Sequence, residues 1–537
     1  MKIVLIRPPA VISDSELRPG ASPPLGLAYI AASLQAASHD IVVVDMVGEA
    51  LARFSKVEST PGILRQGLSD SEAIARIPAD AEIIGVSCMF STEWLVTRSL
   101  ITKIREHFPN AIIIAGGEHV TACPEFCLET CPALDCCGLG EGDELFVDFA
   151  RAVEEGGDWK NTTGLVLRDR DTRCEIRAGS VSDGAGPSFT RPARISQRTC
   201  DPAIFRTTAR KRVREVDRFP LPAWGLFPIR NYIDHAAMPG VDMGRSMPIL
   251  ASRGCPYKCT FCSNPQMWGQ LWKARKPESV LAEMIHWVTE YQVTNFDFYD
   301  LTAIVQKEWT IRMAQLIIDN KLGITWQLPS GTRSEALDDQ VVKLLYQSGC
   351  RNIIYAPEHG STHMLDLIKK RINKKHMLRS VRSAYLANIK TKANFIIGFP
   401  DETIGHTLSS YWFALRLSMV GLDDVSFFPF SPYPGSELFE RVRQEGKIDM
   451  SDAYFTDLVR NPKSFSQHIP DWLMPILGLI GTAMFYVLSF SLRPQRFVEL
   501  LRALWTKRPQ TRLHSALLRV LRAKTREARR LASRLGV

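Results

Sequence analysis

Short apolar runs alternate with helix-like segments along the first third of the chain. The runs are rich in Ile and Val and lie at residues 3–6, 41–44, 83–87 and 112–115. Between them, apolar residues recur at helical spacing at 25–37, 71–77 and 94–107. Strands that alternate with helices predict an α/β fold with a parallel, doubly wound sheet, and such sheets bind ligands at the carboxyl ends of their strands.

Polar residues and glycines follow the predicted strands, so we expect them to meet at the ligand-binding edge of the sheet. They are Arg7, Asp45, Ser87, Thr92, Gly116, Gly117 and His119. No G-x-G-x-x-G motif follows the first strand, which argues against a dinucleotide. A generic Rossmann-like domain with an unknown ligand is the plainer alternative.

A second series of strands and helices begins after residue 245. Its predicted strands lie at 295–299, 324–328, 352–356, 392–397 and 425–429. A repeated βα unit of this kind predicts a partial TIM-type barrel, whose active-site residues lie at the carboxyl ends of the strands.

Residues 472–492 carry no charge and are long enough to span a bilayer at about 1.5 Å per residue. Arg and Leu alternate beyond residue 516, which is typical of a basic amphipathic helix on an anionic membrane surface. The catalytic domains and the basic tail both favour the cytoplasm. We therefore expect a shallow or re-entrant insertion of 472–492, or its burial in a groove, rather than a full crossing. The alternative is a buried helix that closes the barrel.

The chain has 537 residues, 45% of them hydrophobic and 23% charged, which is typical of globular proteins. Its net charge of +9 comes from the tail, because residues 493–537 carry +11 and leave −2 for the rest. A nucleic-acid partner is therefore not expected. Twelve cysteines are too few for a disulfide scaffold, and the first apolar run is too short for a signal peptide, so we expect a cytoplasmic protein.

Three cysteines, Cys255, Cys259 and Cys262, share one turn-rich stretch with the spacing C-x3-C-x2-C. Cysteine thiolates are the usual ligands of iron–sulfur clusters, and three ligands on a four-iron cluster leave one iron open to chemistry. A structural zinc site is the alternative, but it needs a fourth ligand. Neither Cys nor His lies between Cys262 and His286.

This spacing, with Phe261 before the last cysteine, resembles the radical S-adenosylmethionine (radical SAM) family. The resemblance implies that the three cysteines hold a 4Fe-4S cluster and that Phe261 packs beside it. In that family the open iron binds S-adenosylmethionine, and one-electron reduction yields a 5′-deoxyadenosyl radical that abstracts hydrogen from carbon.

Four stretches near the N-terminus, RPP, SPPLGLAYIAASLQAASHDIVVVD, IIGVSCMFSTEW and IIIAGGEHVTACPE, resemble the cobalamin-binding domain that precedes some radical SAM domains. The turn at 138–144 resembles the same family. The resemblance implies that cobalamin binds near Ser87, Thr92, Gly116, Gly117 and His119. Since D-x-H-x-x-G is absent, we expect cobalt without a protein histidine ligand and a hydrogen-bonding role for His119.

Three further cysteines, Cys123, Cys127 and Cys131, are spaced by four residues, and a second metal cluster is one interpretation. The same spacing also describes one face of a helix, and cysteine buries well as a small hydrophobe. We favour the buried helix face.

Several residues at strand ends of the predicted barrel match family positions that bind S-adenosylmethionine. Glu358 lies at the G-x-E-S-G position, although Ala356 and His359 depart from that pattern. Gly398 and Pro400 match a G-x-P strand end near the adenine. Arg333 is a candidate partner for a carboxylate, with ion pairing inside the barrel as the alternative.

These observations predict four regions: a cobalamin-binding domain (1–155), a connector (156–245), a radical SAM partial barrel (246–460) and a C-terminal hydrophobic and basic region (461–537). We expect a cobalamin-dependent radical SAM enzyme that methylates an unactivated carbon of a hydrophobic small molecule. In the family's scheme two molecules of S-adenosylmethionine are used per turnover, one to remethylate cobalamin and one to make the radical.

Two other functions stay open at this level. One is an oxidative cyclase acting on a tetrapyrrole or lipid, like the anaerobic magnesium-protoporphyrin monomethyl ester cyclase, which has the same two domains. The other is a non-catalytic cobalamin- or lipid-binding protein. The expected partners are a reductant such as flavodoxin or ferredoxin and, through the C-terminal region, the inner face of a membrane.

Overall fold

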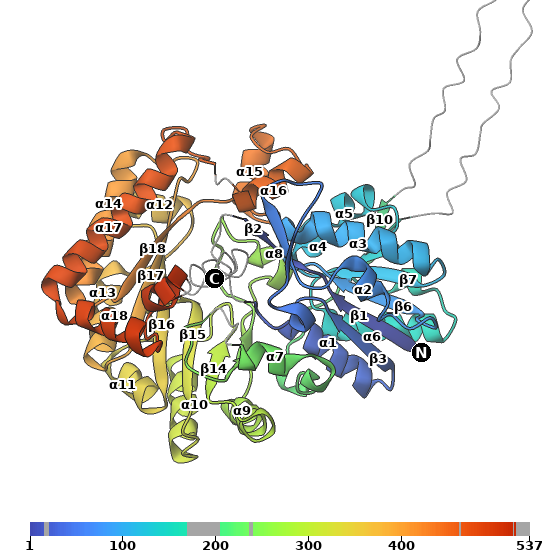
Figure 1. The fold of residues 1–537 in the computed structure, drawn as a ribbon, viewed down its shortest axis with the longest axis horizontal. Coiled ribbons are helices and arrows are strands. Elements are labelled where there is room, and N and C mark those ends of the chain that lie inside the picture. The colour runs from blue at the N-terminus through green and yellow to red at the C-terminus, as the bar shows by residue number, and fades with distance from the viewer. Residues whose placement is uncertain (15–20, 169–203, 236–239, 461–462, 519, 522–537) are drawn as a thin grey trace, which may run out of the picture.

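The computed structural model describes residues 1–14, 21–168, 204–235, 240–460, 463–518 and 520–521. Two large sheets lie side by side, each with helices on its faces (Figure 1). The sequence-predicted α/β class, with a doubly wound sheet followed by a partial barrel, is confirmed.

The first sheet has seven strands in the order β10-β9-β8-β7-β6-β1-β3. Their bounds are β1 Lys2–Arg7, β3 Asp40–Asp45, β6 Ile83–Ser87, β7 Ile112–Gly116, β8 Cys136–Gly138, β9 Leu165–Arg168 and β10 Ile204–Arg206. The five strands from β3 to β8 run parallel, in an order typical of flavodoxin-like sheets. The order reverses between β1 and β6, which is where such sheets bind their ligands.

Helices cover both faces of this sheet. They are α1 Leu25–Ala36, α2 Asp70–Ile74, α3 Trp94–His107, α4 Glu118–Ala122, α5 Pro124–Thr130 and α6 Gly142–Glu154. The core beneath α1 and α6 contains Leu5 and Phe146, and the core beneath α3 and α5 contains Val4 and Leu100. Alternate residues of β1 thus face opposite layers, as a sheet buried on both faces requires.

The first sheet continues beyond residue 155, where the sequence predicts the connector to begin. Strands β9 and β10 add to it antiparallel after α6. A small sheet, which the sequence pattern did not predict, consists of β2 Ala10–Ser13, β4 Phe54–Lys56 and β5 Ile63–Gln66. Helix α7 Ile229–Asp234 precedes residues 236–239, and the second sheet begins after them.

The second sheet has six parallel strands that follow one another in chain order. They are β11 Ser246–Ile249, β14 Asn295–Phe298, β15 Thr325–Thr332, β16 Cys350–Glu358, β17 Lys390–Ile397 and β18 Asp424–Pro429. The sequence pattern did not predict β11, which comes just before the cysteine-rich stretch. Six consecutive parallel strands form the partial barrel, with their carboxyl ends at one rim.

The outer helices of this barrel are α9 Pro277–Tyr291, α10 Lys307–Asp319, α11 Asp339–Gln347, α13 Lys374–Leu386, α14 Ile404–Val420 and α17 Met474–Leu492. The shorter elements of this part of the chain are β12 Ser252–Arg253, β13 Lys273–Ala274, α8 Asn264–Trp268, α12 Thr362–Leu367, α15 Glu437–Gln444 and α16 Asp452–Arg460. Finally, α18 Gln495–Thr506 follows α17.

Helix α17 packs against α14 and β18 and thereby takes the place of the last barrel helix (Figure 1). Gly481 makes the approach possible, since a Cβ there would lie 2.5 Å from the Tyr411 ring. Among the described residues, Asp471–Leu492 is the one helical stretch long and apolar enough to cross a bilayer, judged by length and composition alone. One of its faces is buried in the barrel, while Trp472, Leu479 and Val487 on the other are about 70% exposed.

Two arginines hold the end of α17 to the end of α14. Arg493 donates to the carbonyl oxygens of Ser418 and Met419, both at 2.9 Å. Arg496 donates to the carbonyl oxygens of Gly421 and Leu422 at 2.6 and 2.7 Å. Both arginines belong to the basic stretch 493–537, but they are buried and are therefore not free to contact a membrane surface. The predicted amphipathic tail helix lies largely outside the described residues.

Candidate functional site

The three spaced cysteines lie in the loop between β12 and α8, at the carboxyl rim of the barrel. All three thiols are free and partly buried. Gly254, just before Cys255, has φ +85°, and a Cβ there would lie 2.0 Å from the Leu271 carbonyl oxygen. The glycine is therefore required for the chain to wrap into this loop.

Burial raises the pKa of the Cys262 thiol to about 12, and the negative charges of Cys259 and Cys255 act in the same direction. Burial also raises the pKa of Cys259, which lies near both Lys370 and Glu358. The three thiols thus share one partly buried volume. A cationic metal cluster would stabilise their thiolate forms.

Phe261 packs against the barrel strand end that the sequence also singles out. Its ring lies edge-on to that of Phe399, at a centroid distance of 5.9 Å. Glu402 fixes this strand end by accepting hydrogen bonds from the backbone N–H groups of Gly398 and Phe399 at 2.7 and 3.1 Å. Gly398 has φ +88°, which favours glycine at this position.

Glu358 ends strand β16 with φ +61°, in the left-handed region that non-glycine residues seldom adopt. Its carboxylate accepts a hydrogen bond from the Lys370 ammonium at 2.9 Å. Burial disfavours the charged amine, but the neighbouring carboxylate raises the pKa of Lys370 above its usual value. Lys370 was missed by the sequence analysis because it follows α12 and has no recognisable motif around it.

His359, which departs from the family pattern, packs against the strand end at Phe399. Its ring is fully buried beside Phe399, with Nε2 3.1 Å from the Glu402 carboxylate. The presence of His359 instead of serine therefore alters the packing around Phe399 and Glu402. It does not displace Glu358 from the end of β16.

Arg333 lies over the ring of Tyr257, which belongs to the cysteine loop, with 3.7 Å between the guanidinium carbon and the ring centroid. It also pairs with Glu335 at 2.8 Å. Its Nη1 is buried and has no hydrogen-bond partner in the described structure. An unpaired buried donor beside the cysteine loop suits the carboxylate of a ligand.

The predicted polar residues of the first sheet also come together. Arg7 at the end of β1 lies 3.8 Å from Asp45 at the end of β3 and donates to the Tyr232 hydroxyl at 2.5 Å. Tyr232, from α7, in turn donates to Asp45 at 2.7 Å. Burial raises the pKa of Glu93, which lies near Arg7, to about 7.

The end of β6 leads into an apolar stretch at the same edge. Ser87 is its last residue, and Met89 and Phe90 follow it with 44% and 62% of their surface exposed. Thr92 lies in the next turn. Large exposed apolar side chains at a strand edge suit the face of a bulky, partly hydrophobic ligand.

The glycine loop after β7 packs tightly against this stretch. Gly117 has φ +111°, and a Cβ there would lie 2.4 Å from the Cys88 carbonyl oxygen. A Cβ at Gly116 would come no closer than 3.8 Å to a neighbour. The loop thus requires glycine at 117 to reach β6.

His119 lies in a buried pocket between aromatic rings. Its ring is 5.4 Å from those of Trp94 and Phe455, and its Nδ1 is hydrogen bonded to the Ser91 hydroxyl at 2.9 Å. This environment agrees with the predicted hydrogen-bonding role. Ser91, which the sequence pattern did not single out, makes this contact.

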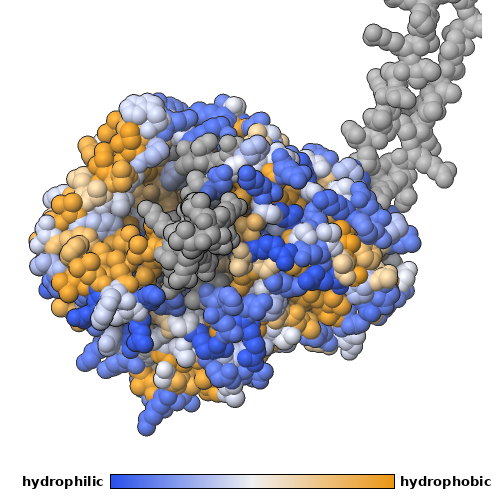
Figure 2. Space-filling model, viewed as in Figure 1, coloured by the Kyte–Doolittle hydropathy of each residue, from blue (hydrophilic) through white to orange (hydrophobic). Residues whose placement is uncertain are grey.

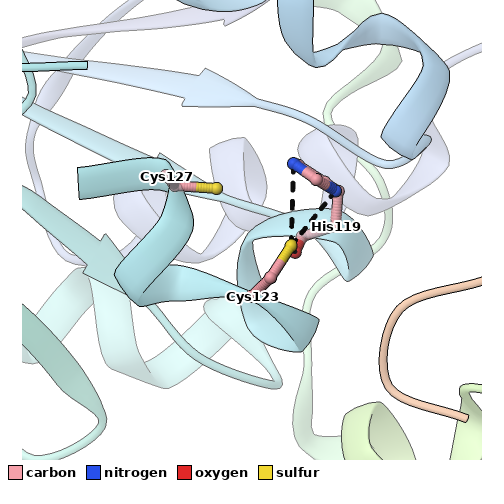
Figure 3. Close-up of side chains that lie close together, drawn as sticks. All are labelled: His119, Cys123 and Cys127. Carbon is pink, nitrogen blue, oxygen red and sulfur yellow. Dashed lines mark hydrogen bonds between the residues drawn. The ribbon is translucent and has the colours of Figure 1, made fainter. Parts of the chain in front are cut away.

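Figure 3 shows His119 with Cys123 and Cys127, whose ligand atoms all lie within 4.8 Å of one another. Hydrogen bonding with Cys127 and then with His119 lowers the pKa of Cys123 to about 6. No fourth His, Cys, Asp or Glu of the described chain joins this group. Cys127 and Cys131 both lie in the hydrophobic core, so their burial agrees with the prediction. The three cysteines do not share one helix face, because Cys123 lies between α4 and α5 and Cys131 follows α5.

The two candidate sites are joined by polar contacts across the boundary between the sheets. Arg253, two residues before Cys255, pairs with Asp143 through two hydrogen bonds of 2.8 and 3.0 Å. Ser263, just after Cys262, donates to Glu118 at the start of α4, which follows the glycine loop. The cysteine loop is therefore held against the strand-end loops of the first sheet.

A cavity of about 450 Å³ lies at this boundary, between the 138–144 turn and α8. Arg212 lines it, with Nε bonded to Glu141 at 2.8 Å. Both of its Nη atoms are buried without a hydrogen-bond partner in the described structure. These donors suit the polar groups of a ligand held between the two sheets.

Family models match both parts of the chain. The "B12 binding domain" model matches residues 18–150, and the "Radical SAM superfamily" model matches residues 249–411. The second range contains the cysteine loop and most of the barrel.

Among known proteins, the chain is similar to an uncharacterized methyltransferase of Pyrococcus horikoshii, with 28% identity over 82% of this chain and 83% of the relative. It is also similar to the anaerobic magnesium-protoporphyrin IX monomethyl ester cyclase of Cereibacter sphaeroides, with 24% identity over 87% of this chain and 68% of the relative.

Among solved structures, the fold is similar to that of the radical S-adenosylmethionine methyltransferase TsrM from Kitasatospora setae, with cobalamin and a [4Fe-4S] cluster bound. The TM-score is 0.60 at 14% identity and covers 91% of this chain and 90% of that one. The chain therefore belongs to the radical SAM enzymes that carry a B12-binding domain.

Proposed function

We propose that this enzyme transfers a methyl group to an unactivated carbon of a hydrophobic small molecule, using cobalamin, a 4Fe-4S cluster and S-adenosylmethionine. The observation that carries the proposal is the position of the cysteine loop, which Arg253 and Ser263 hold against the strand-end loops of the B12-binding domain. When bound, the cluster and S-adenosylmethionine supply a carbon-centred radical, and cobalamin supplies the methyl group.

In this proposal Cys255, Cys259 and Cys262 hold the cluster, and Phe261 shields it. The unpaired Nη1 of Arg333 and the Lys370–Glu358 pair fit the carboxylate and amino groups of S-adenosylmethionine, respectively. The site thus offers the Glu358 carboxylate as an acceptor for the amino group and the Arg333 N–H as a donor to the carboxylate of this amino acid moiety.

For cobalamin, the apolar stretch at Met89 and Phe90 fits the flat face of a corrin, next to the glycine loop at Gly116 and Gly117. His119 is already hydrogen bonded and packed between rings, so it positions the loop and leaves cobalt without a histidine ligand. Ser87 and Thr92 flank the same edge.

Oxidative cyclisation is a second candidate, and the similarity to the magnesium-protoporphyrin cyclase favours it. The two functions differ in the mass of the product, because methylation adds one carbon and two hydrogens. Oxidation or cyclisation does not add carbon.

The protein also requires a one-electron reductant, for which flavodoxin or ferredoxin are suitable partners in the cytoplasm.

The outer face of the barrel suits attachment to the inner surface of a membrane. Exposed apolar side chains gather there over α14, α17 and α18, at the left of Figure 2. Because α17 is packed on the barrel, it would lie in the plane of the membrane surface.

The proposal is tested by anaerobic reconstitution of the full chain with iron, sulfide and cobalamin, followed by reduction in the presence of S-adenosylmethionine. We expect 5′-deoxyadenosine and a product heavier by one methylene. A cluster-replete, reduced protein that makes no 5′-deoxyadenosine would contradict any radical reaction. Formation of 5′-deoxyadenosine with a product of unchanged carbon number would favour cyclisation.

A further inference from the structure

A pocket of about 480 Å³ opens at the outer helices of the barrel, and no residue of the cysteine loop lines it. It lies between the start of α12, the first turn of α13 and the outer face of α14. Its volume is in the range of small-molecule sites, and its walls include Lys374, Arg416, Ser409 and Trp412.

The pocket carries two positive charges that no carboxylate balances within the described structure. The Lys374 ammonium donates to the Gly360 carbonyl oxygen and the Thr362 hydroxyl, both at 2.9 Å, which fixes it in the wall. Burial and the positive charge of Arg416 lower the pKa of Lys374. Neither cation lies within 4 Å of an Asp or Glu oxygen of the described residues, so the pocket favours an anion.

The rim of the pocket belongs to an exposed apolar stripe. Leu408 and Trp412 lie on one face of α14 and are 55% and 58% exposed. Further exposed apolar side chains lie on α17, where Leu479 is 70% exposed, and on α18, where Trp505 is 86% exposed. Tryptophans beside a cationic pocket are typical of proteins at the boundary between lipid tails and headgroups.

We propose that this pocket binds the phosphate group of an anionic lipid while Trp412 and Leu408 enter the lipid interface. The inference rests on the membrane attachment proposed above and adds the headgroup that the surface recognises. Lys374 and Arg416 supply the charge, and the fixed position of Lys374 supplies the geometry. The ligand is an attachment point and lies outside the barrel that holds the chemistry.

Vesicle binding of the full-length, cofactor-loaded protein tests the proposal. The probes are vesicles of phosphatidylcholine alone and vesicles in which part of it is replaced by phosphatidic acid. We expect the wild type to prefer the phosphatidic acid vesicles and the K374Q/R416Q variant to bind them roughly thirtyfold more weakly, because each cation near an anionic surface contributes about fivefold.

The matched control is K375Q/R382Q, which removes the same charge from exposed positions on α13 outside the pocket. We expect the control to lose several-fold less affinity than K374Q/R416Q. Equal losses in both variants would mean diffuse electrostatic attraction and would overturn the pocket. Unchanged binding of K374Q/R416Q would overturn it as well.

A second measurement separates the pocket from the membrane surface. Calorimetric titration with short-chain phosphatidic acid in monomeric form should give binding to the wild type and none to K374Q/R416Q. If the protein binds the soluble lipid but not the vesicles, the proposed membrane attachment is wrong and the proposed lipid-phosphate site is supported. If inorganic phosphate binds as tightly as the soluble lipid, a free anion is the ligand and the lipid assignment is overturned.

Discussion

Arg253 and Asp143 form a buried, two-pronged ion pair that ties the cysteine loop of the barrel to the first turn of α6 in the B12-binding domain. The guanidinium also lies over the rings of Phe219 and Tyr29, so it is enclosed by both domains and the connector. The pair fixes the distance between the two cofactor sites.

Replacing Arg253 by Gln should destabilise the folded protein by about 3 to 5 kcal/mol, because it leaves the Asp143 carboxylate buried without its partner. Chemical denaturation measures the change. Arg312→Gln, which breaks an exposed pair with Glu278, is the control and should cost less than about 1 kcal/mol. Equal losses in the two variants would show that the Arg253 pair is not buried in solution.

Replacing Cys259 by Ala should abolish the iron–sulfur cluster, because three thiolates are the minimum set for this site in our proposal. Iron and sulfide content and the visible absorption of the reconstituted protein report the loss. Cys350→Ala, which removes a buried thiol elsewhere in the barrel, should keep the cluster. A full four-iron cluster in Cys259→Ala would disprove our ligand assignment.

Glu402→Gln should weaken the binding of S-adenosylmethionine by at least about tenfold, since a hydrogen bond to a charged group contributes about 1.5 to 3 kcal/mol. The carboxylate positions the Gly398 strand end through two backbone N–H groups, so the effect should appear in the dissociation constant. The yield of 5′-deoxyadenosine at saturating S-adenosylmethionine should change little. Asp401→Asn, which removes the neighbouring carboxylate, is the control. A lower saturated yield with unchanged binding would contradict the positioning role.

Glu93 should make the protein more stable as the pH falls from about 8 to about 5. Its pKa in the folded protein, about 7, lies above its usual value of 4.5, so the folded state takes up a proton first. This contribution is fully present below pH 4.5 and is lost as the pH rises through about 7. Urea denaturation at several pH values should show a smaller pH dependence for Glu93→Gln than for the wild type.

Glu106→Gln, on the exposed face of α3, is the control for that series and should follow the wild-type curve. If Glu93→Gln also follows the wild-type curve, the carboxyl is not buried as described.

Replacing Leu479 and Val487 by Ser should weaken membrane binding by at least about tenfold, because a fully buried apolar side chain contributes about 1.5 to 3 kcal/mol. Both side chains point away from the barrel, so the fold should remain intact. Vesicle sedimentation measures the effect. Ile285→Ser, on α9 at the opposite edge of the barrel sheet, should bind vesicles as the wild type does. Wild-type binding by the double variant would place the membrane contact elsewhere.

Local patterns predicted much of this molecule. Runs of Ile and Val placed β1, β3, β6 and β7 within one residue, because strands buried on both faces read as continuous apolar segments. The cysteine spacing located the candidate cluster loop, since its chemistry is contained in a few adjacent residues. β11 was missed because its short run carries a proline and little β-branched character.

Long-range pairing was not predictable from these patterns. Arg253 and Asp143 are 110 positions apart, and the sequence around either residue does not indicate that the other is its partner. Lys370 belongs to the candidate site because the chain returns after α12 and places its ammonium beside Glu358. The uniform apolar composition of α17 likewise concealed that one face packs on the barrel while the other is exposed, because Gly481 and its neighbours decide the packing.

The contacts of Arg493 and Arg496 with the end of α14 set a lower limit on the length of a chain that can fold. A protein that ended before α17 would expose Phe427 of β18 and leave the last carbonyl groups of α14 without their donors. The smallest self-sufficient form of the barrel therefore extends at least to Arg496. Removing α17 would therefore test whether the barrel folds. Substitutions of exposed residues are needed to test what the outer face binds.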